Sequence, residues 1–256
     1  MENGAQKLRN KSALITGGNG GIGLATAKLF RDHGARIAIT GRNPESLARA
    51  QQELGADTLV LRRDSGKLAD VELTMQEIKS AFGSLDILFV NAGASHPVPF
   101  DQVTEASFDE ISATNFKGAF FTIQKALPLL SKNASVIVTT SVSNQRGAPR
   151  FSAYAACKAA LRSLVQSLAL DLIQRGVRVN AISPGPIATV NFGERWNMTP
   201  EAAQLVKDGL ISRSPIKRFG TPQEVAQAAL FLASEDSSYM VGAEIVVDGG
   251  ITLALQ

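Results

Sequence analysis

The chain has 256 residues, with 26 Lys and Arg, 23 Asp and Glu, two His and one Cys. This length suits one domain with a substantial core, and 45% hydrophobic against 19% charged residues is typical of a folded globular protein. The net charge of +3 comes without a run of Lys or Arg, which argues against a nucleic-acid binder. One Cys excludes an intrachain disulfide, two His leave little for a metal site, and no apolar run could span a membrane. We therefore expect a soluble, cytoplasmic protein without a metal.

Short β-branched runs alternate with longer helical stretches, which is the pattern of βαβ units around a parallel sheet. Strands are predicted at 12–16, 36–40, 58–61, 85–90, 135–140, 178–182 and 245–247. Helices are predicted at about 21–34, 44–54, 66–82, 104–130, 152–175 and 222–233. Asn43 before Pro44 predicts an N-cap, and Thr221 with Glu224 predicts a capping box. The fold class is α/β: one Rossmann-type, doubly wound domain over residues 1–256, with a seven-stranded parallel sheet and helices on both faces.

The segment 184–215 has weak strand signals and contains several Pro and Gly. An insertion of this size after the carboxyl end of a strand often forms a lid or a binding loop. Phe192 and Trp196 lie on it. They either close over an apolar substrate or anchor the lid to the core.

A glycine-rich turn, Thr16 to Gly23, joins the first strand to the first helix. Glycines permit a tight turn and a close backbone approach, and a helix N-terminus offers free N–H groups to a pyrophosphate. Gly18, Gly20 and Gly23 satisfy the pattern G-x-G-x-x-G. That pattern alone is weak, but after a first strand and before a first helix it predicts dinucleotide binding.

The end of the second strand has the sequence Thr40-Gly41-Arg42-Asn43. A dinucleotide site that prefers NAD carries an acid here, which accepts a hydrogen bond from the adenosine ribose. This chain has no acid at that place, and Arg42 could pair with a 2′-phosphate. The alternative is that Arg42 is a solvated loop residue. NADP(H) is therefore preferred over NAD(H).

Tyr154 and Lys158 lie one turn apart at the start of the helix 152–175. A phenol has a pKa of about 10, and a fixed ammonium group nearby lowers it toward a useful value. Ser141 follows the strand 135–140, where its hydroxyl could donate to a carbonyl oxygen. Asn115 lies within a predicted helix although Asn is a poor helix former, so we expect a kink or a polar task there.

The glycine turn, Asn115, Ser141, Tyr154 and Lys158 together resemble the short-chain dehydrogenase/reductase family, of the short single-domain type. The resemblance extends from Gly17 to Asp248-Gly249-Gly250 and so covers nearly the whole chain. In the family's register the glycine motif is T-G-x-x-x-G-x-G, which is satisfied by Thr16, Gly17, Gly21 and Gly23.

The resemblance implies a role for each matching residue. Tyr154 would be the general acid/base and Ser141 would orient the substrate oxygen. Lys158 would lower the Tyr154 pKa and hold the nicotinamide ribose, and Asn115 would hold a water in a proton relay. The implied cofactor-binding residues also include Gly17, Asn19, Gly20, Gly21, Ile22, Gly23, Arg42, Asn43, Asp64, Ser65, Asn91, Ala92, Gly93, Pro184, Gly185, Ile187 and Thr189.

Three positions depart from the family's usual pattern. Val90 stands where an Asn is common, and Ser65 stands where Val or Leu is usual. Gly20 occupies a position that is often basic in NADP-preferring members. The preference for NADP(H) therefore depends on Arg42 and the missing acid, and NAD(H) stays possible.

Several weaker signals concern the surroundings of this site. We expect at least one of Ser143, Asn144 and Gln145 to face the substrate, and Cys157 to be a small, half-buried helix residue. His96 either lines the pocket or lies exposed in a loop. The helices 104–130 and 152–175 have wide apolar faces, and in this family such a pair builds a dimer interface, so we expect a homotetramer.

The leading hypothesis is a hydride transfer between NADP(H) and a carbonyl or secondary alcohol, with a small-molecule substrate. The same motifs suit a 3-oxoacyl carrier-protein reductase, a sugar or polyol dehydrogenase with NAD(H), or a reductase of steroids or small ketones. A carrier-protein reductase would need a basic patch near the entrance, for which the scattered candidates are Arg146, Arg150, Arg195, Lys207 and Arg213. A non-catalytic dinucleotide-binding sensor, or a dehydratase or epimerase of the same fold, is a more distant alternative.

Overall fold

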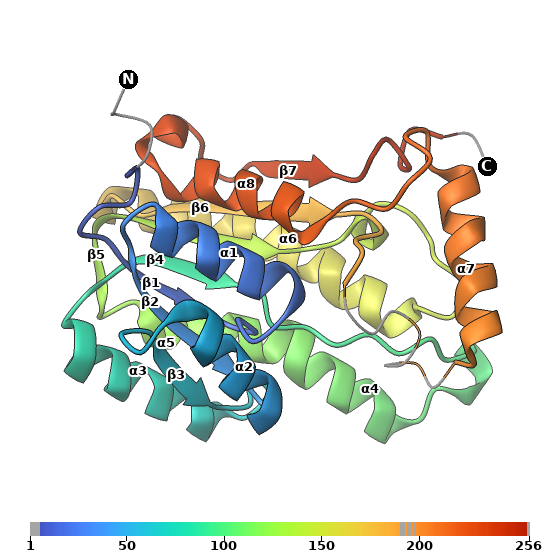
Figure 1. Ribbon diagram of the computed structural model, residues 1–256, viewed down its shortest axis with the longest axis horizontal. Helices are drawn as coiled ribbons and strands as arrows, with labels where there is room; N and C mark the ends of the chain where they lie inside the picture. Colours follow the sequence, from blue (N-terminus) through green and yellow to red (C-terminus); the bar gives the residue numbers. More distant parts are fainter. Residues whose placement is uncertain (1–5, 190–192, 194–195, 197, 255–256) are drawn as a thin grey trace.

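A sheet of parallel strands lies at the centre of the molecule (Figure 1). The computed structural model describes residues 6–189, 193, 196 and 198–254. Within them the sheet has seven strands in the order β3-β2-β1-β4-β5-β6-β7, which confirms the predicted doubly wound architecture. The strands are β1 (Ser12–Ile15), β2 (Arg36–Gly41), β3 (Leu59–Arg62), β4 (Leu85–Val90), β5 (Leu130–Thr139), β6 (Arg178–Pro184) and β7 (Glu244–Val247).

Helices cover both faces of the sheet because successive strand residues point to opposite sides. In β1, Leu14 packs into the core beneath α3 (Leu68–Phe82), α5 (Gly118–Ala126) and α6 (Ser152–Leu172). Its neighbour Ile15 packs into the other core, beneath α1 (Gly21–Asp32), α2 (Pro44–Leu54) and α8 (Pro222–Ala233). The inner strands β1, β4 and β6 are buried on both faces, as expected within a parallel sheet.

The predicted helix over 104–130 is wrong as a single element. The chain forms α4 (Glu105–Ser112), then a π-helical turn (Ala113–Lys117), then α5, and Leu130 already belongs to β5. Asn115 lies inside the π-helical turn, where its amide Nδ2 donates to the carbonyl oxygens of Ala94 (2.7 Å) and Ile111 (2.9 Å). Of the two expectations for Asn115, a kink or a polar task, the polar task is confirmed, and it lies where the helix widens into the π-helical turn.

The predicted helix ends are confirmed where a cap fixes them. The Asn43 side chain accepts a hydrogen bond from the Ser46 amide (2.8 Å), and Thr221 with Glu224 forms both bonds of the capping box. Elsewhere the predicted boundaries shift by a few residues. The largest shift is in β5, which begins at Leu130 instead of 135 because its first residues form an irregular extension beside Leu85.

The segment after β6 contains a helix that the sequence did not predict. This helix, α7 (Pro200–Arg213), begins at Thr199, whose side chain accepts from the Ala202 amide. Figure 1 shows it at the end of the molecule toward which the β7 arrow points, away from the helices that cover the sheet. Phe192, one of the two predicted lid aromatics, lies outside the described residues.

The described residues show neither a membrane-spanning helix nor a metal-binding cluster. Among them we find no helix that is long and apolar enough to cross a membrane. The same residues contain no group of three or more His, Cys, Asp or Glu side chains that could hold a metal ion.

The start of α5 depends on a close backbone approach at Gly118. A Cβ atom at this position would overlap the Ser65 carbonyl oxygen. We expect Gly118→Ala to lower the free energy of unfolding by about 1–3 kcal/mol, because backbone atoms must move to relieve the overlap. Urea unfolding of the purified protein measures the change.

Gly209→Ala in α7 is the matched control for this substitution. No atom lies within 4 Å of a Cβ at Gly209. Alanine at this position should raise the free energy of unfolding by up to about 1 kcal/mol, because alanine loses less backbone freedom than glycine when the helix forms. Equal unfolding free energies for the two variants would contradict the close approach.

Candidate active site

The predicted site residues gather at the carboxyl ends of four neighbouring strands. Gly17, Asn91, Ser141 and Gly185 follow β1, β4, β5 and β6, which are adjacent in the sheet. In a doubly wound sheet, ligands bind outside this edge, at the point where the strand order reverses. That point lies between β1 and β4 here.

Three positions of the turn require glycine. Gly17 (φ 66°) and Gly21 (φ 51°) adopt the left-handed conformation that favours glycine. At Gly23 a Cβ would overlap the Gly17 carbonyl oxygen, whereas a Cβ at Gly20 would have no atom within 4 Å. The structure therefore supports the register Gly17–Gly21–Gly23 over the simple pattern that includes Gly20.

The N-terminus of α1 is open to an anion. No described side chain caps it, and its first turn contains no acidic residue. Ile22 packs against the core beneath α1, so the first turn is firmly held. Free N–H groups, the helix dipole and the open space at Gly20 together fit a phosphate group. The residues present thus fit the dinucleotide that the sequence implies.

The end of β2 is shaped by Asn19. Its amide Nδ2 donates to the Ser46 hydroxyl at the start of α2 (2.6 Å). This places the Asn19 side chain against Gly41, where a Cβ would lie 2.5 Å from the Asn19 Cγ and Oδ1 atoms. A carboxylate at residue 41 would therefore have to displace Asn19. The neighbouring Arg42 is mostly exposed, with its guanidinium 4.0 Å from the Asp64 carboxylate.

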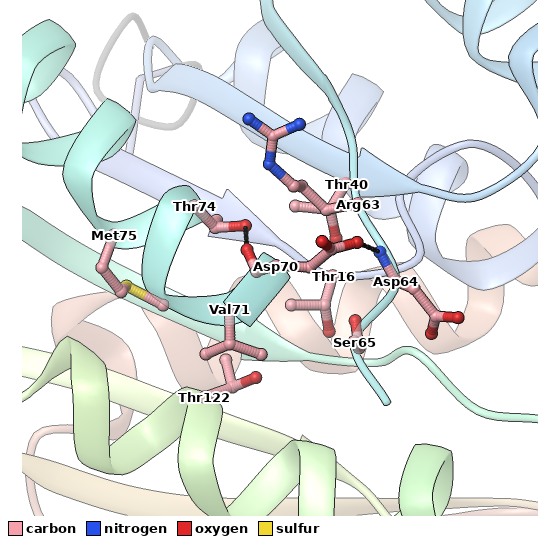
Figure 2. A pocket seen from close by; sticks show the side chains of 10 residues that line it. All are labelled: Thr16, Thr40, Arg63, Asp64, Ser65, Asp70, Val71, Thr74, Met75 and Thr122. Carbon is pink, nitrogen blue, oxygen red and sulfur yellow. Dashed lines mark hydrogen bonds between the residues drawn. The ribbon is translucent and has the colours of Figure 1, made fainter. Parts of the chain in front are cut away.

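Asp64 and Ser65 follow β3 beside a small cavity of about 10 Å³ (Figure 2). Asp70 fixes the turn by accepting a hydrogen bond from the Asp64 amide (2.7 Å), and Asp64 itself accepts from the Gly66 amide (2.9 Å). Figure 2 shows the Arg63 guanidinium and the Asp64 carboxylate pointing in opposite directions. The ion-pair distance of 4.0 Å places the Asp64 carboxylate beside Arg42 instead.

Asn91 braces the glycine turn instead of standing free. Its amide Nδ2 donates to the Thr16 carbonyl oxygen (3.2 Å), and the Thr16 hydroxyl accepts from the backbone amides of Asn91 and Ala92 (both 3.0 Å). The Thr139 hydroxyl donates to Asn91 Oδ1 (3.3 Å). These bonds tie the ends of β1, β4 and β5 together. Val90, which replaces the family's usual Asn, is buried in the core.

Lys158 is buried in α6 below the ends of β4 and β5. Its Nζ donates to the Thr139 carbonyl oxygen (2.7 Å) and lies 5.7 Å from the centre of the Tyr154 ring. A Cβ at Gly93 would lie 3.6 Å from this Nζ and 3.0 Å from Asn115 Oδ1, so Gly93 separates the two polar groups. Burial lowers the pKa of Lys158 to about 8, which still keeps it protonated at neutral pH.

Ser141 is nearly buried at the end of β5, in extended backbone. Its Oγ accepts a hydrogen bond from the Ser143 amide (3.2 Å). That bond uses a lone pair of the hydroxyl and leaves its proton free to donate. The arrangement suits a group that donates to a substrate oxygen.

The surroundings of Tyr154 combine aromatic side chains with a cavity. The Tyr154 and Phe151 rings meet edge to face, with centres 6.1 Å apart, and Phe151 also meets Trp196 at 5.6 Å. The Trp196 indole donates to the Ser95 carbonyl oxygen (2.8 Å). This contact favours the anchoring role for Trp196. His96 and Tyr154 both line a cavity of about 370 Å³, which favours a pocket position for His96.

The residues after β6 connect β7 with the glycine turn. The Gly185 amide donates to the Val247 carbonyl oxygen (3.0 Å), and Ile187 forms a bridge with Gly220. A Cβ at Gly21 would lie 3.0 Å from the Thr189 methyl group. Thr189 therefore lies beside the first turn of α1.

Two of the three residues expected near the substrate have other partners. The side chains of Asn144 and Gln145 donate to the Glu244 carboxylate, which leaves Ser143 as the candidate. Sequence reasoning missed Glu244. The available signal was one charged residue, Glu244, immediately before the apolar run 245–247. Cys157 is more buried than expected, and burial raises the pKa of its thiol.

Comparison with known proteins agrees with this geometry. The family model described as Enoyl-(Acyl carrier protein) reductase matches residues 17–252. The chain is 42% identical to Oxidoreductase asL5 of Sarocladium schorii, over 96% of this chain and 97% of that protein. It is 35% identical to Glucose 1-dehydrogenase of Gluconobacter oxydans (strain 621H), over 96% and 94% of the two chains.

A solved structure shares the same fold. The crystal structure of Levodione Reductase superimposes with a TM-score of 0.90 at 31% identity, covering 97% of this chain and all (100%) of that chain. The chain therefore belongs to the short-chain dehydrogenase/reductase family, whose members bind nicotinamide dinucleotides, and is an oxidoreductase that acts on CH–OH or C=O groups.

Proposed function

We propose that the protein transfers a hydride between NADP(H) and a carbonyl or secondary alcohol, with Tyr154 as general acid/base. One observation carries this proposal. The buried Lys158 ammonium lies 5.7 Å from the Tyr154 ring, at the same sheet edge where the Ser141 hydroxyl accepts from the Ser143 amide and, within the described residues, keeps its proton for donation.

The side chains divide the proton chemistry among them. When bound, the nicotinamide dinucleotide supplies or accepts the hydride. Ser141 donates a hydrogen bond to the substrate oxygen and fixes its direction. Tyr154 gives its phenolic proton to that oxygen in reduction and takes it back in oxidation. The Lys158 cation stabilises the phenolate and so lowers the pKa of Tyr154 toward the working range.

The cofactor is proposed to lie across the carboxyl edge of β1, β4 and β6. The glycine turn and the N-terminus of α1 would hold the pyrophosphate, and Asp64 with Ser65 would meet the adenine. Asn91, Ala92 and Gly93 would border the adenosine ribose. Lys158 has donors left for the nicotinamide ribose, because its Nζ makes one described hydrogen bond. Pro184, Gly185, Ile187 and Thr189 would hold the nicotinamide.

Two features favour NADP(H) over NAD(H). The Asn19 side chain occupies the space that a carboxylate at residue 41 would need. Arg42 is more than half exposed, and its contact with Asp64 at 4.0 Å is worth little, so it can turn to a 2′-phosphate. Asn43 would then contribute through its backbone, because its side chain caps α2.

The substrate is proposed to be a small molecule that meets Tyr154 beneath the segment 184–215, which would act as a lid on the single domain 1–256. Of the basic candidates for a carrier-protein partner, Arg146 donates to the Ala254 carbonyl oxygen and Arg213 to the Gly209 carbonyl oxygen, while Arg195 lies outside the described residues. Arg150, by contrast, lines the cavity beside Tyr154, so a 3-oxoacyl carrier-protein substrate stays the alternative. The cytoplasmic location stays a prediction from composition.

A homotetramer is part of the proposal. The helices α4, α5 and α6 expose large apolar side chains, namely Phe108, Phe120 and Leu170. On the edge strand β7, Val246 is also exposed. Two separate apolar faces are what an assembly with two kinds of interface requires.

Replacing Tyr154 by Phe tests the chemical step. We expect turnover of the best ketone from a panel, with NADPH, to fall by about 10²–10⁴-fold, because the proton donor is lost. Binding of NADPH, followed by cofactor fluorescence, should change less than about twofold. Tyr239→Phe alters the other, fully exposed Tyr of the chain and should leave turnover unchanged. Near wild-type turnover of Tyr154→Phe would refute the proposal, and a wild-type protein that binds NADPH but turns over no substrate would favour the sensor.

Replacing Arg42 by Ala tests the cofactor preference. We expect NADPH binding to weaken about tenfold, because a charge-assisted contact with the 2′-phosphate is lost, while NADH binding stays within about twofold. Arg49→Ala, which alters an exposed Arg in the neighbouring helix α2, is the control. Wild-type protein that binds NADH as tightly as NADPH would show that Arg42 does not select the cofactor.

The buried Lys158 predicts a pH dependence of stability. Its pKa is about 8 in the folded protein and about 10.5 in the unfolded chain, so between these values only the unfolded chain holds the proton. Rising pH therefore favours the folded state in this window. The measured quantity is the free energy of unfolding of the wild type minus that of Lys158→Met. This difference should rise by up to about 1.4 kcal/mol per pH unit between about pH 8 and 10.5. Urea unfolding without cofactor at several pH values measures this, and a difference that falls or stays flat would contradict the burial.

A further inference from the structure

Glu244 is a buried carboxylate for which the proposed chemistry has no direct use. It is the first residue of β7, and its side chain is 8% exposed. Its Oε1 accepts from the Thr140 hydroxyl (2.5 Å) and the Asn144 amide Nδ2 (2.7 Å). Its Oε2 accepts from the Gln145 amide Nε2 (2.9 Å) and lies 3.2 Å from Arg162 Nε. Four donors thus converge on one carboxylate.

The partners of Glu244 lie on both sides of Ser141. Thr140 immediately precedes Ser141, and Asn144 and Gln145 follow it on the same short turn. The carboxylate therefore holds the two ends of the turn that carries the Ser141 hydroxyl. Because the Ser141 Oγ accepts from the Ser143 amide inside this turn, the direction of its free proton depends on the conformation of the turn.

The fourth partner connects the same carboxylate to α6. Arg162 lies one helical turn beyond Lys158 and two beyond Tyr154, so the three residues follow one face of the helix. Glu244 thus joins the turn of Ser141 to the helix of Tyr154 and Lys158. A carboxylate has two acceptor oxygens and can accept all four of these contacts, whereas an amide has only one acceptor oxygen and an apolar residue has none.

We propose that Glu244 is a positioning residue, which acts through Ser141 by fixing the turn 140–145 against α6. The proposal rests on the proposed function, because it takes Ser141 as the group that orients the substrate oxygen. Glu244 itself touches neither substrate nor cofactor. Its loss removes the acceptor that the Asn144 and Gln145 side chains share, so the turn loses its connection to α6 and relaxes.

The first experiment is a double-mutant cycle of Glu244→Gln and Ser141→Ala. The reaction is the reduction, with NADPH, of the ketone that the wild-type protein turns over fastest. We expect Glu244→Gln to lower kcat about 10–100-fold, with the KM for NADPH within about twofold of wild type. In the Ser141→Ala background the same substitution should change kcat less than about twofold, because the group through which it acts is gone.

Asp86→Asn is the matched control. Asp86 is also a largely buried carboxylate, which accepts from the Ser12 backbone amide and the Ser131 hydroxyl. It lies at the amino end of β4, far from the carboxyl ends of the strands where the site lies. This variant should lose thermal stability and keep its kcat. Asn144→Ala removes one donor without unpairing the carboxylate. It gives a smaller loss of kcat, and it keeps the test possible if Glu244→Gln does not fold.

Hydrogen exchange gives a readout that does not depend on turnover. In Glu244→Gln the amides of residues 142–146 should exchange about tenfold faster than in wild type, while those of α1 keep their protection. Unchanged protection of 142–146 would overturn the inference whether or not a ketone is reduced.

The outcomes separate the two proposals. If Ser141→Ala alone leaves kcat unchanged, the role of Ser141 in the proposed function is wrong. If Ser141→Ala lowers kcat but Glu244→Gln does not, or lowers it by the same factor in both backgrounds, the positioning role of Glu244 is wrong and the proposed function stands.

Discussion

The burial of the Lys158 ammonium is the constraint on which the rest of the site depends. A cation in the interior needs a fixed oxygen, and the chain provides the Thr139 carbonyl at the last residue of β5. This bond fixes the position of α6 along the direction of the strands. Because Tyr154 lies one turn before Lys158 and Ser141 lies two residues after Thr139, the distance between phenol and hydroxyl follows from where one ammonium group is buried.

Much of this arrangement could be predicted from the sequence, because it depends on local rules. The β-branched runs gave all seven described strands, since residues buried on both faces of a parallel sheet have to be apolar. Caps such as Asn43 fixed helix starts to the residue. The spacing of Tyr154 and Lys158 predicted their shared face directly. Strand ends in a parallel sheet meet at one edge, so the gathering of Gly17, Asn91 and Ser141 followed from topology.

The features that escaped prediction depend on contacts between distant parts of the chain. At Asn115 only the distortion could be expected, because the partner of its amide is the Ala94 backbone, 21 residues away. Glu244 lies 104 residues from Thr140, and nothing local shows that a carboxylate at the start of β7 meets the turn after β5. The helix α7 was hidden because its segment is rich in Pro and Gly, although the Thr199–Pro200 pair that begins it is an ordinary start signal.

The Trp196 indole joins segments that are 101 residues apart, through its bond to the Ser95 carbonyl oxygen. Its ring also packs on Phe151, just before α6. Three loops from three different strands therefore share one anchor above Tyr154. Replacing only one of these loops by the corresponding loop of a related protein would separate Trp196 from Ser95 or Phe151. Substrate range in this fold thus behaves as a property of the three loops together, and they would be inherited, or redesigned, as one module.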